Sequence, residues 1–201
     1  ILDGGMGREL ERIGAPFRQP EWSALALIEA PKMVTQAHLN FIKAGAQIIT
    51  TNAYAVIPHH IGEERFKRDG RRLIRQSVEC AKDAQNGNTI KIAGCIPPLF
   101  GSYLPDQFDE SRVDEILTPF IEEQDDTVDL WIIETMSSSQ EAITIGSKLS
   151  KRTNKPIWLS FTMHRIDADH VTLRHGNYID QAIIELLDHF TPDALLLNCC
   201  D

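Results

Sequence analysis

Short apolar runs alternate along this chain with segments in which apolar residues recur at helical spacing. The six apolar runs cover residues 1–2, 47–52, 90–95, 129–134, 157–162 and 194–197. The helical segments cover residues 8–13, 31–42, 70–83, 109–121, 138–149 and 179–190. This alternation predicts a parallel sheet, because a strand can be followed by a parallel neighbour only after a crossover, which is usually a helix.

Each of the six runs ends in, or is directly followed by, a polar or reactive side chain. These side chains are Asp3, Asn52, Cys95, Glu134, Thr162 and Asn198 with Cys199. A closed barrel collects its ligand groups from many strand ends, whereas a doubly wound sheet concentrates them at one switch point. The pattern therefore favours an α/β fold of the TIM (β/α)8 type, of which about six strand-helix units are present. Because eight units need about 250 residues, we expect residues 1–201 to be a single barrel domain that is incomplete at its C-terminus.

Composition and charge exclude several classes of partner. Hydrophobic residues make up 42% and charged residues 24% of the 201 residues, and the formal net charge is −9. Without a cluster of Lys and Arg, binding to nucleic acid or to an acidic membrane is not expected. No apolar run approaches the roughly 18 residues of a membrane span and no signal peptide is evident, so we expect a cytoplasmic protein. The four cysteines are expected to be reduced thiols.

The segment from Asp3 to Gly7 combines a carboxylate with three glycines. Glycine lets the backbone turn tightly and approach a ligand, so Asp3 and the N–H groups after it suit the two ends of an amino acid. On local sequence, an Asx turn in which Asp3 caps the following helix is favoured over this functional interpretation.

Glu134 is the strongest single functional candidate outside the cysteines. It ends a strongly apolar run, where a desolvated carboxylate needs a cation, several donors or a proton. A salt bridge to a neighbouring Lys or Arg is the structural alternative. Just beyond it, Ser138 and Glu141 have the spacing of a capping box at the start of the next helix.

The cysteines have both a functional and a structural interpretation. Cys199 follows the last apolar run, where a ligand set would lie, but an inert buried thiol is as common. Cys95 is a metal ligand or, more commonly at a strand end, a packing residue. Cys200 adjoins Cys199, and because adjacent strand residues face opposite sides, we do not expect it to be a ligand.

The histidines give no zinc signature, because their spacing is not that of a zinc motif. His38 is expected in the core or at its rim, on the apolar face of a helix. His59 and His60 are expected to be solvated. The polar segment 164–176 is predicted to be a mobile loop.

Four segments, taken in order and at their separations, resemble the homocysteine S-methyltransferase family, and the likeness covers the whole chain. The segments are Ile1-Leu2-Asp3-Gly4-Gly5-Met6-Gly7, Thr51-Asn52-Ala53-Tyr54, Ile133-Glu134-Thr135 and Leu197-Asn198-Cys199. The resemblance implies a barrel enzyme of methionine biosynthesis. Such an enzyme holds a catalytic zinc through three cysteines and transfers a methyl group to the zinc-bound thiolate of homocysteine, giving methionine.

The resemblance also assigns site residues. Cys199 matches the first zinc ligand, while the Gly-Gly-Cys-Cys segment that supplies the other two has no counterpart here. Zinc is therefore expected for the full-length protein rather than for residues 1–201. Asp3, Gly4 and Glu134 match positions that hold the amino and carboxyl ends of the substrate, and Asn52 and Asn198 are neighbouring candidates.

The methyl donor is not resolved by the resemblance. S-methylmethionine or another sulfonium is favoured, and a sulfonium could rest against Tyr54, Tyr103 or Trp131 through cation–π attraction. A corrinoid-dependent role, with the methyl group carried by a partner domain, stays open. The alternative from another class is a zinc-less relative or fragment that acts as an amino-acid-binding or interaction protein.

Overall fold

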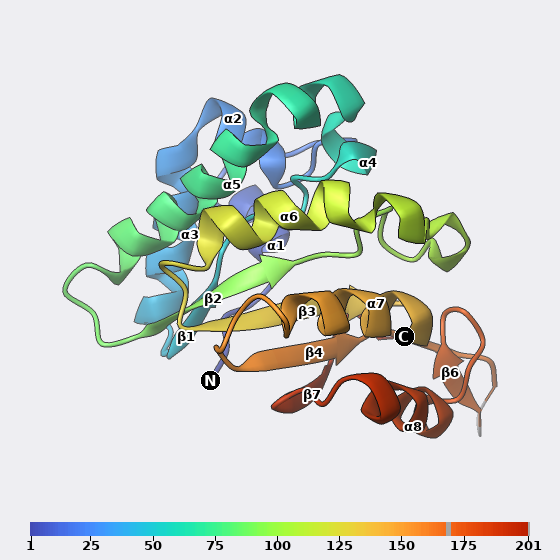
Figure 1. The fold of residues 1–201 in the computed structure, drawn as a ribbon. Helices are drawn as coiled ribbons and strands as arrows, with labels where there is room; N and C mark the ends of the chain where they lie inside the picture. Colours follow the sequence, from blue (N-terminus) through green and yellow to red (C-terminus); the bar gives the residue numbers. More distant parts are fainter. Residues whose placement is uncertain (168–169, 201) are drawn as a thin grey trace.

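A computed structural model describes residues 1–167 and 170–200, and its centre is a parallel sheet of five strands in the order β1-β2-β3-β4-β7 (Figure 1). The strands are β1 (Ile48–Thr50), β2 (Lys91–Ile96), β3 (Leu130–Met136), β4 (Ile157–Phe161) and β7 (Ala194–Leu197). Leu2 adds a parallel bridge to Ile48, which places the N-terminal segment beside β1. Each strand of this sheet thus lies next to the preceding strand of the same sheet. This sequential order is that of a barrel rather than of a doubly wound sheet. The predicted fold class is confirmed.

The main helices lie along one face of this sheet (Figure 1). The helices are α1 (Met6–Arg12), α2 (Ala24–Glu29), α3 (Pro31–Lys43), α4 (Pro58–Ile61), α5 (Glu63–Gln85), α6 (Val113–Gln124), α7 (Ser139–Leu149) and α8 (Ile179–His189), with short 3-10 turns η1 (Pro105–Gln107) and η2 (Glu110–Arg112). Two core clusters result. The larger lies between helices and sheet and contains Phe120 and Trp131, both fully buried.

The smaller cluster lies on the inner face of the sheet and decides where the site can form. It contains Ala93, Leu130 and Ile132, with partly buried neighbours Leu2, Ile48, Trp158 and Leu196. Side chains alternate between the two faces of a sheet, so the residue two positions after an inner residue also faces inward. The residues that follow Ile48, Ile132, Trp158 and Leu196 in this way are, in the same order, Thr50, Glu134, Ser160 and Asn198. An apolar layer thus lies below a polar layer at the carboxyl ends of the strands.

Several predicted boundaries are wrong. The run 1–2 forms only the isolated bridge at Leu2, and the predicted strand 47–52 shortens to β1. The helix predicted to start at Gly70 begins seven residues earlier, at Glu63. Gly70 lies inside this helix, α5, beside Phe66 of the preceding turn. There, an added Cβ would lie 3.0 Å from Phe66 Cδ2.

The segment 164–176 is not the irregular loop that its polarity predicted. It takes part in an antiparallel pair of β5 (Met163–Arg165) and β6 (Val171–Leu173), with Met163 opposite Leu173 and Arg165 opposite Val171. Residues 168–169 of this segment, and Asp201, lie outside the described residues.

Within residues 1–167 and 170–200, no helix has the length and apolar character needed to cross a membrane.

Gly146 gives a test of helix packing. It lies in α7, where an added Cβ would be 2.5 Å from Phe190 Cδ1. Gly146→Ala should destabilise the fold by about 1–3 kcal/mol, because overpacking exceeds the roughly 1 kcal/mol that alanine adds to a helix interior. Urea unfolding measures this change. The exposed Gln140→Ala variant is the control, and a G146A protein as stable as wild type would contradict the packing described.

Candidate active site

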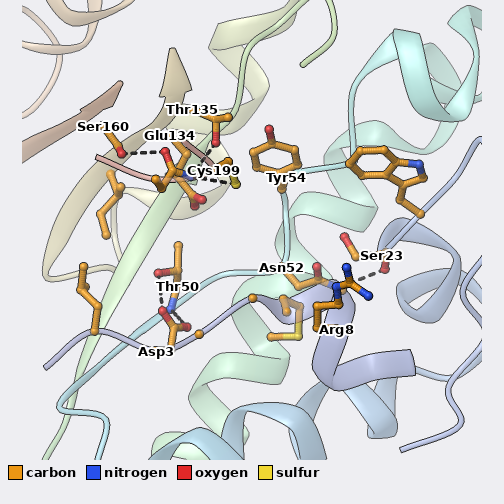
Figure 2. A pocket seen from close by; sticks show the side chains of 18 of the residues that line it. Asp3, Arg8, Ser23, Thr50, Asn52, Tyr54, Glu134, Thr135, Ser160 and Cys199 are labelled. Carbon is orange, nitrogen blue, oxygen red and sulfur yellow. Dashed lines mark hydrogen bonds between the residues drawn. The ribbon is translucent and has the colours of Figure 1, made fainter. Parts of the chain in front are cut away.

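A large pocket opens at the carboxyl ends of the strands (Figure 2). Its volume is about 930 Å³, and it takes lining residues from the N-terminal turn, from the ends of β1, β3 and β4, and from the segment after β7. Five of the six candidate site residues were predicted to be substrate-binding and one to be a metal ligand. The structure brings all six to this pocket: Asp3, Gly4, Asn52, Glu134, Asn198 and Cys199.

Asp3 is tied to β1 and does not cap α1. Its carboxylate accepts hydrogen bonds from Thr50 N at 2.7 Å and from Thr50 Oγ1 at 3.0 Å. The N-cap of α1 is Gly5, and no side chain caps it, so the Asx-turn interpretation is wrong. Burial raises the pKa of Asp3 to about 6, although the bonds from Thr50 oppose this shift.

Gly4 and Gly5 bring bare backbone to the pocket. An added Cβ at Gly4 would lie 3.0 Å from Phe41 Cε1, so the close packing of this turn leaves no room for a side chain. Across the described parts of the chain, the N–H groups of Gly4 and Gly5 donate to no protein acceptor. They are therefore available to an anionic group of a ligand.

Glu134 faces the pocket from β3 and forms no ion pair within residues 1–167 and 170–200. The salt-bridge alternative is therefore wrong. The pKa of Glu134 is raised to about 7, mainly by burial and also by the negative charge of Asp3, while a hydrogen bond from the Cys95 thiol lowers it. Near neutral pH, Glu134 exchanges a proton readily.

Cys95 forms a hydrogen bond with Glu134 and does not line the pocket. Its side chain is fully buried, and burial raises the pKa of its thiol well above the ordinary value. Such a thiol stays protonated and can donate to a carboxylate. Its position supports the packing interpretation rather than that of a metal ligand.

Asn198 joins three strands at the rim. Its Nδ2 donates to Thr135 Oγ1 at 2.8 Å, and its Oδ1 accepts from Ser160 Oγ at 2.7 Å. Thr135 has a φ of 60° where the register between β3 and β4 shifts. Asn198 therefore fixes the irregular backbone that follows Glu134.

Cys199 is exposed and presents its side chain to the pocket. Its φ is 49°, and its carbonyl oxygen accepts a hydrogen bond from Thr162 Oγ1 at 2.8 Å. Cys200 does not line the pocket, and its thiol instead donates to Asn198 O at 3.4 Å. The expectation that the two neighbouring thiols face different sides agrees with this arrangement.

The described residues do not assemble a metal centre. No group of three or more His, Cys, Asp or Glu side chains with metal-binding geometry occurs among them. Cys199 is the one thiol that they present to the pocket, and a catalytic zinc site needs three protein ligands.

Asn52 is buried, with 2% of its surface exposed, and keeps one polar atom unpaired. Its Nδ2 donates to Ser23 O at 3.1 Å, which fixes the orientation of the amide. Its Oδ1 has no hydrogen-bond partner among residues 1–167 and 170–200. An unpaired buried acceptor costs free energy, which a ligand with a donor group would recover.

The aromatic candidates separate into two groups. Tyr54 and Tyr103 line the pocket, and the Tyr54 hydroxyl bonds Ser102 Oγ at 2.7 Å. Trp131 does not line the pocket, because it lies on the outer face of β3 and its Nε1 donates to Asp125 Oδ1 at 3.1 Å. The prediction that it contacts a sulfonium is wrong. Trp22 lines the pocket instead.

The histidines are structural. His38 is fully buried, as expected, and burial lowers its pKa to about 4. His59 is exposed, whereas the prediction that His60 is solvated is wrong. His60 stacks on Trp22 with ring centroids 4.9 Å apart, and its Nδ1 bonds Pro20 O at 3.0 Å.

Sequence reasoning missed three hydroxyl residues of the site: Thr50, Thr135 and Ser160. The signal was present for Thr50 and Ser160, which occupy inner positions two residues after apolar ones. Nothing in the sequence indicated the left-handed backbone at Thr135, since a β-branched residue rarely adopts it.

Comparison with known proteins gives consistent results. The model of the family described as homocysteine S-methyltransferase matches residues 1–201. Homocysteine S-methyltransferase of Escherichia coli (strain K12) is 28% identical over 224 residues, covering 99% of this chain and 68% of the relative. Selenocysteine methyltransferase of Astragalus bisulcatus is 29% identical over 234 residues, with the same coverage. The metallated form of the homocysteine methyltransferase MmuM from Escherichia coli superimposes with a TM-score of 0.81 at 27% identity, covering 98% of this chain and 73% of that one.

The raised pKa of Glu134 predicts how stability depends on pH. Between its ordinary pKa of 4.5 and its folded value of about 7, the unfolded chain loses a proton that the folded chain keeps. Folding stability should therefore fall as pH rises through this window, by up to roughly 3 kcal/mol from this group. Glu134→Gln should remove that part of the slope.

Urea unfolding at pH 5 and pH 7.5 tests this expectation. The exposed Glu110→Gln variant controls for the loss of one negative charge. Equal slopes for wild type and E134Q would show that Glu134 is not desolvated as described.

Proposed function

The chain belongs to the homocysteine S-methyltransferase family, and we propose that its pocket binds homocysteine and promotes methyl transfer to the substrate thiol, giving methionine. One observation carries the proposal: the Asp3 and Glu134 carboxylates and the Cys199 thiol all face the same pocket. A cytoplasmic enzyme that contacts neither nucleic acid nor membrane is proposed with it.

The two carboxylates bind the substrate ammonium. The negative charge of Asp3 raises the pKa of Glu134, so a cation that contacts both carboxylates is favourable. The ammonium also restores the ionised form of Glu134, because an opposite charge lowers a raised carboxyl pKa.

The substrate carboxylate binds to hydrogen-bond donors rather than to the two acidic side chains. The unpaired N–H groups of Gly4 and Gly5 are suitable donors, and Asn52 Oδ1 offers a further acceptor for a donor group. With both ends of the amino acid held, the thiol side chain projects toward the rim formed by Asn198 and Cys199. Holding the substrate in this orientation makes the displacement, which is bimolecular in solution, effectively unimolecular and therefore faster.

Zinc, when bound to the full-length protein, would remove the thiol proton and hold the resulting thiolate. Cys199 is proposed as one ligand, and the described residues alone do not complete the site. What these residues contribute directly is binding, orientation and shielding from water.

A sulfonium such as S-methylmethionine is the proposed methyl donor. The pocket, at about 930 Å³, is within the size range of small-molecule sites and can hold two small amino acids. The face of Tyr54 is suitable for the positive sulfur. Tyr103 already has the guanidinium of Arg174 over its ring, 4.4 Å from the ring centroid, so it is the weaker candidate.

The alternative is an amino-acid-binding protein without catalytic zinc. A single thiol at the pocket favours it. The test uses the full-length protein, with metal analysis and an assay for methionine formed from homocysteine and S-methylmethionine. Stoichiometric zinc with turnover supports the enzyme. Homocysteine binding with neither zinc nor turnover supports the alternative.

Substitution of the two carboxylates should weaken substrate binding. Asp3→Asn and Glu134→Gln should each lower kcat/KM for homocysteine by about 10- to 100-fold, mainly through KM, because each loses a charge-assisted hydrogen bond. In the wild type, kcat/KM should fall below pH 7 as Glu134 takes up a proton. Steady-state kinetics at several pH values test both expectations. Glu110→Gln is the control, and an unchanged KM in both site variants would contradict the assignment.

The two neighbouring thiols give a matched pair of variants. Cys199→Ser should lower the zinc content of the full-length protein and abolish turnover, because a hydroxyl is a poor zinc ligand. Cys200→Ser should leave both unchanged, since its thiol does not line the pocket. Metal analysis of purified protein is the measurement, and equal zinc in the two variants would show that Cys199 is no ligand.

A further inference from the structure

Glu141, the third residue of α7, does not complete the capping box that its spacing predicts. Ser138 Oγ accepts from Glu141 N at 3.2 Å, which is the first half of the motif. In the second half, the carboxylate would return to the N–H of Ser138. Instead, Glu141 Oε1 accepts from Leu99 N at 2.9 Å, and the side chain is buried, with 3% of the residue exposed.

Leu99 lies in the loop after β2, which we call the aromatic loop and define as residues 97–103. Its side chain is fully buried. The two residues before it, Pro97 and Pro98, have no N–H group, so Leu99 is the first donor of the loop. Glu141 therefore ties this loop to the start of α7.

The same loop reaches the pocket three residues later. Ser102 Oγ bonds the Tyr54 hydroxyl at 2.7 Å, and Tyr54 lines the pocket. Between these ties, Gly101 has a φ of 115°, and an added Cβ would lie 3.0 Å from His59 Nδ1. Leu99 and Ser102 are only three residues apart, so we expect a shift at Leu99 to displace Ser102 as well.

We propose that Glu141 is a positioning residue: its bond to Leu99 N sets the place of the aromatic loop and thereby the hydrogen bond of Tyr54 in the substrate pocket. The effect on substrate relies on the proposed function, whereas the effect on the loop does not.

The bond needs an acceptor oxygen rather than a charge. Burial raises the pKa of Glu141 to about 7, and the bond from Leu99 opposes the shift, so ionised and protonated forms both occur near neutral pH. Both forms, and a glutamine amide, present an oxygen to Leu99 N. Glu141→Gln should thus retain the tie, Glu141→Ala should lose it, and Glu141→Asp, shorter by one methylene, should not reach.

Hydrogen exchange of the full-length protein tests the tie directly. In E141A, the amides of residues 99–103 should exchange at least about 10-fold faster, while the strands keep their protection. E141Q should match wild type, and Gln140→Ala, an exposed neighbour on α7, is the control. If E141A does not fold, E141D takes its place. Unchanged protection in the Ala or Asp variant, or equal loss in E141Q, would overturn the proposal.

A double-mutant cycle tests the consequence for substrate. Glu141→Ala should raise the KM for homocysteine about 10-fold and Ser102→Ala about 3-fold. The double variant should stay near 10-fold rather than reach 30-fold, because both changes release the same Tyr54 contact. Additive effects would overturn the link from Glu141 to Tyr54. If no methyl transfer occurs in any form, the proposed function fails, and the exchange experiment alone decides the role of Glu141.

Discussion

The central constraint on this structure is a pair of carboxylates in one desolvated pocket. Neither Asp3 nor Glu134 forms an ion pair within the described parts of the chain, and burial raises both pKa values, to about 6 and about 7. Two buried negative charges repel each other and lack solvent, so the empty pocket is destabilised near neutral pH. A ligand ammonium relieves this cost. The stability lost by the empty protein thus becomes affinity for a cationic group, which is a common relation between stability and function.

Holding such a pocket open requires a rigid rim, and hydrogen bonds between neighbouring strands provide it. Asn198 uses both ends of its amide on Thr135 and Ser160, from two other strands. Four non-glycine residues in the described parts of the chain have a positive φ, and two of them, Thr135 and Cys199, adjoin a residue proposed to bind substrate. Strained backbone of this kind persists only where surrounding contacts determine it, and here those contacts come from Asn198 and Thr162.

Much of the fold could be predicted from the sequence, because it depends on local periodicity. The apolar runs gave the order of the five strands, and α3, α7 and α8 begin or end close to their predicted residues. The errors arose where hydrophobic periodicity gives no signal. Gly70 lies inside α5 with the Phe66 ring of the preceding turn against it, although glycine is a weak helix former. The polar segment pairs with itself through β5 and β6, whose three residues each are too short to show a clear alternation.

The candidate site was predictable in its members but not in their partners. Alternation along strands places Glu134 and Asn198 on the inner face at the rim, whereas Asp3 directly follows the inner residue Leu2 and was selected, like the other two, by the family resemblance. Their partners are distant in sequence: Thr50 for Asp3, Cys95 for Glu134 and Leu99 for Glu141. Glu141 is instructive, because local spacing predicts that its carboxylate caps its own helix. The N–H of Leu99, which follows two prolines, takes Glu141 Oε1 as its acceptor, and a buried donor without a partner costs more than an unfinished cap. The stronger demand decides the geometry, and it joins α7 to the aromatic side of the pocket.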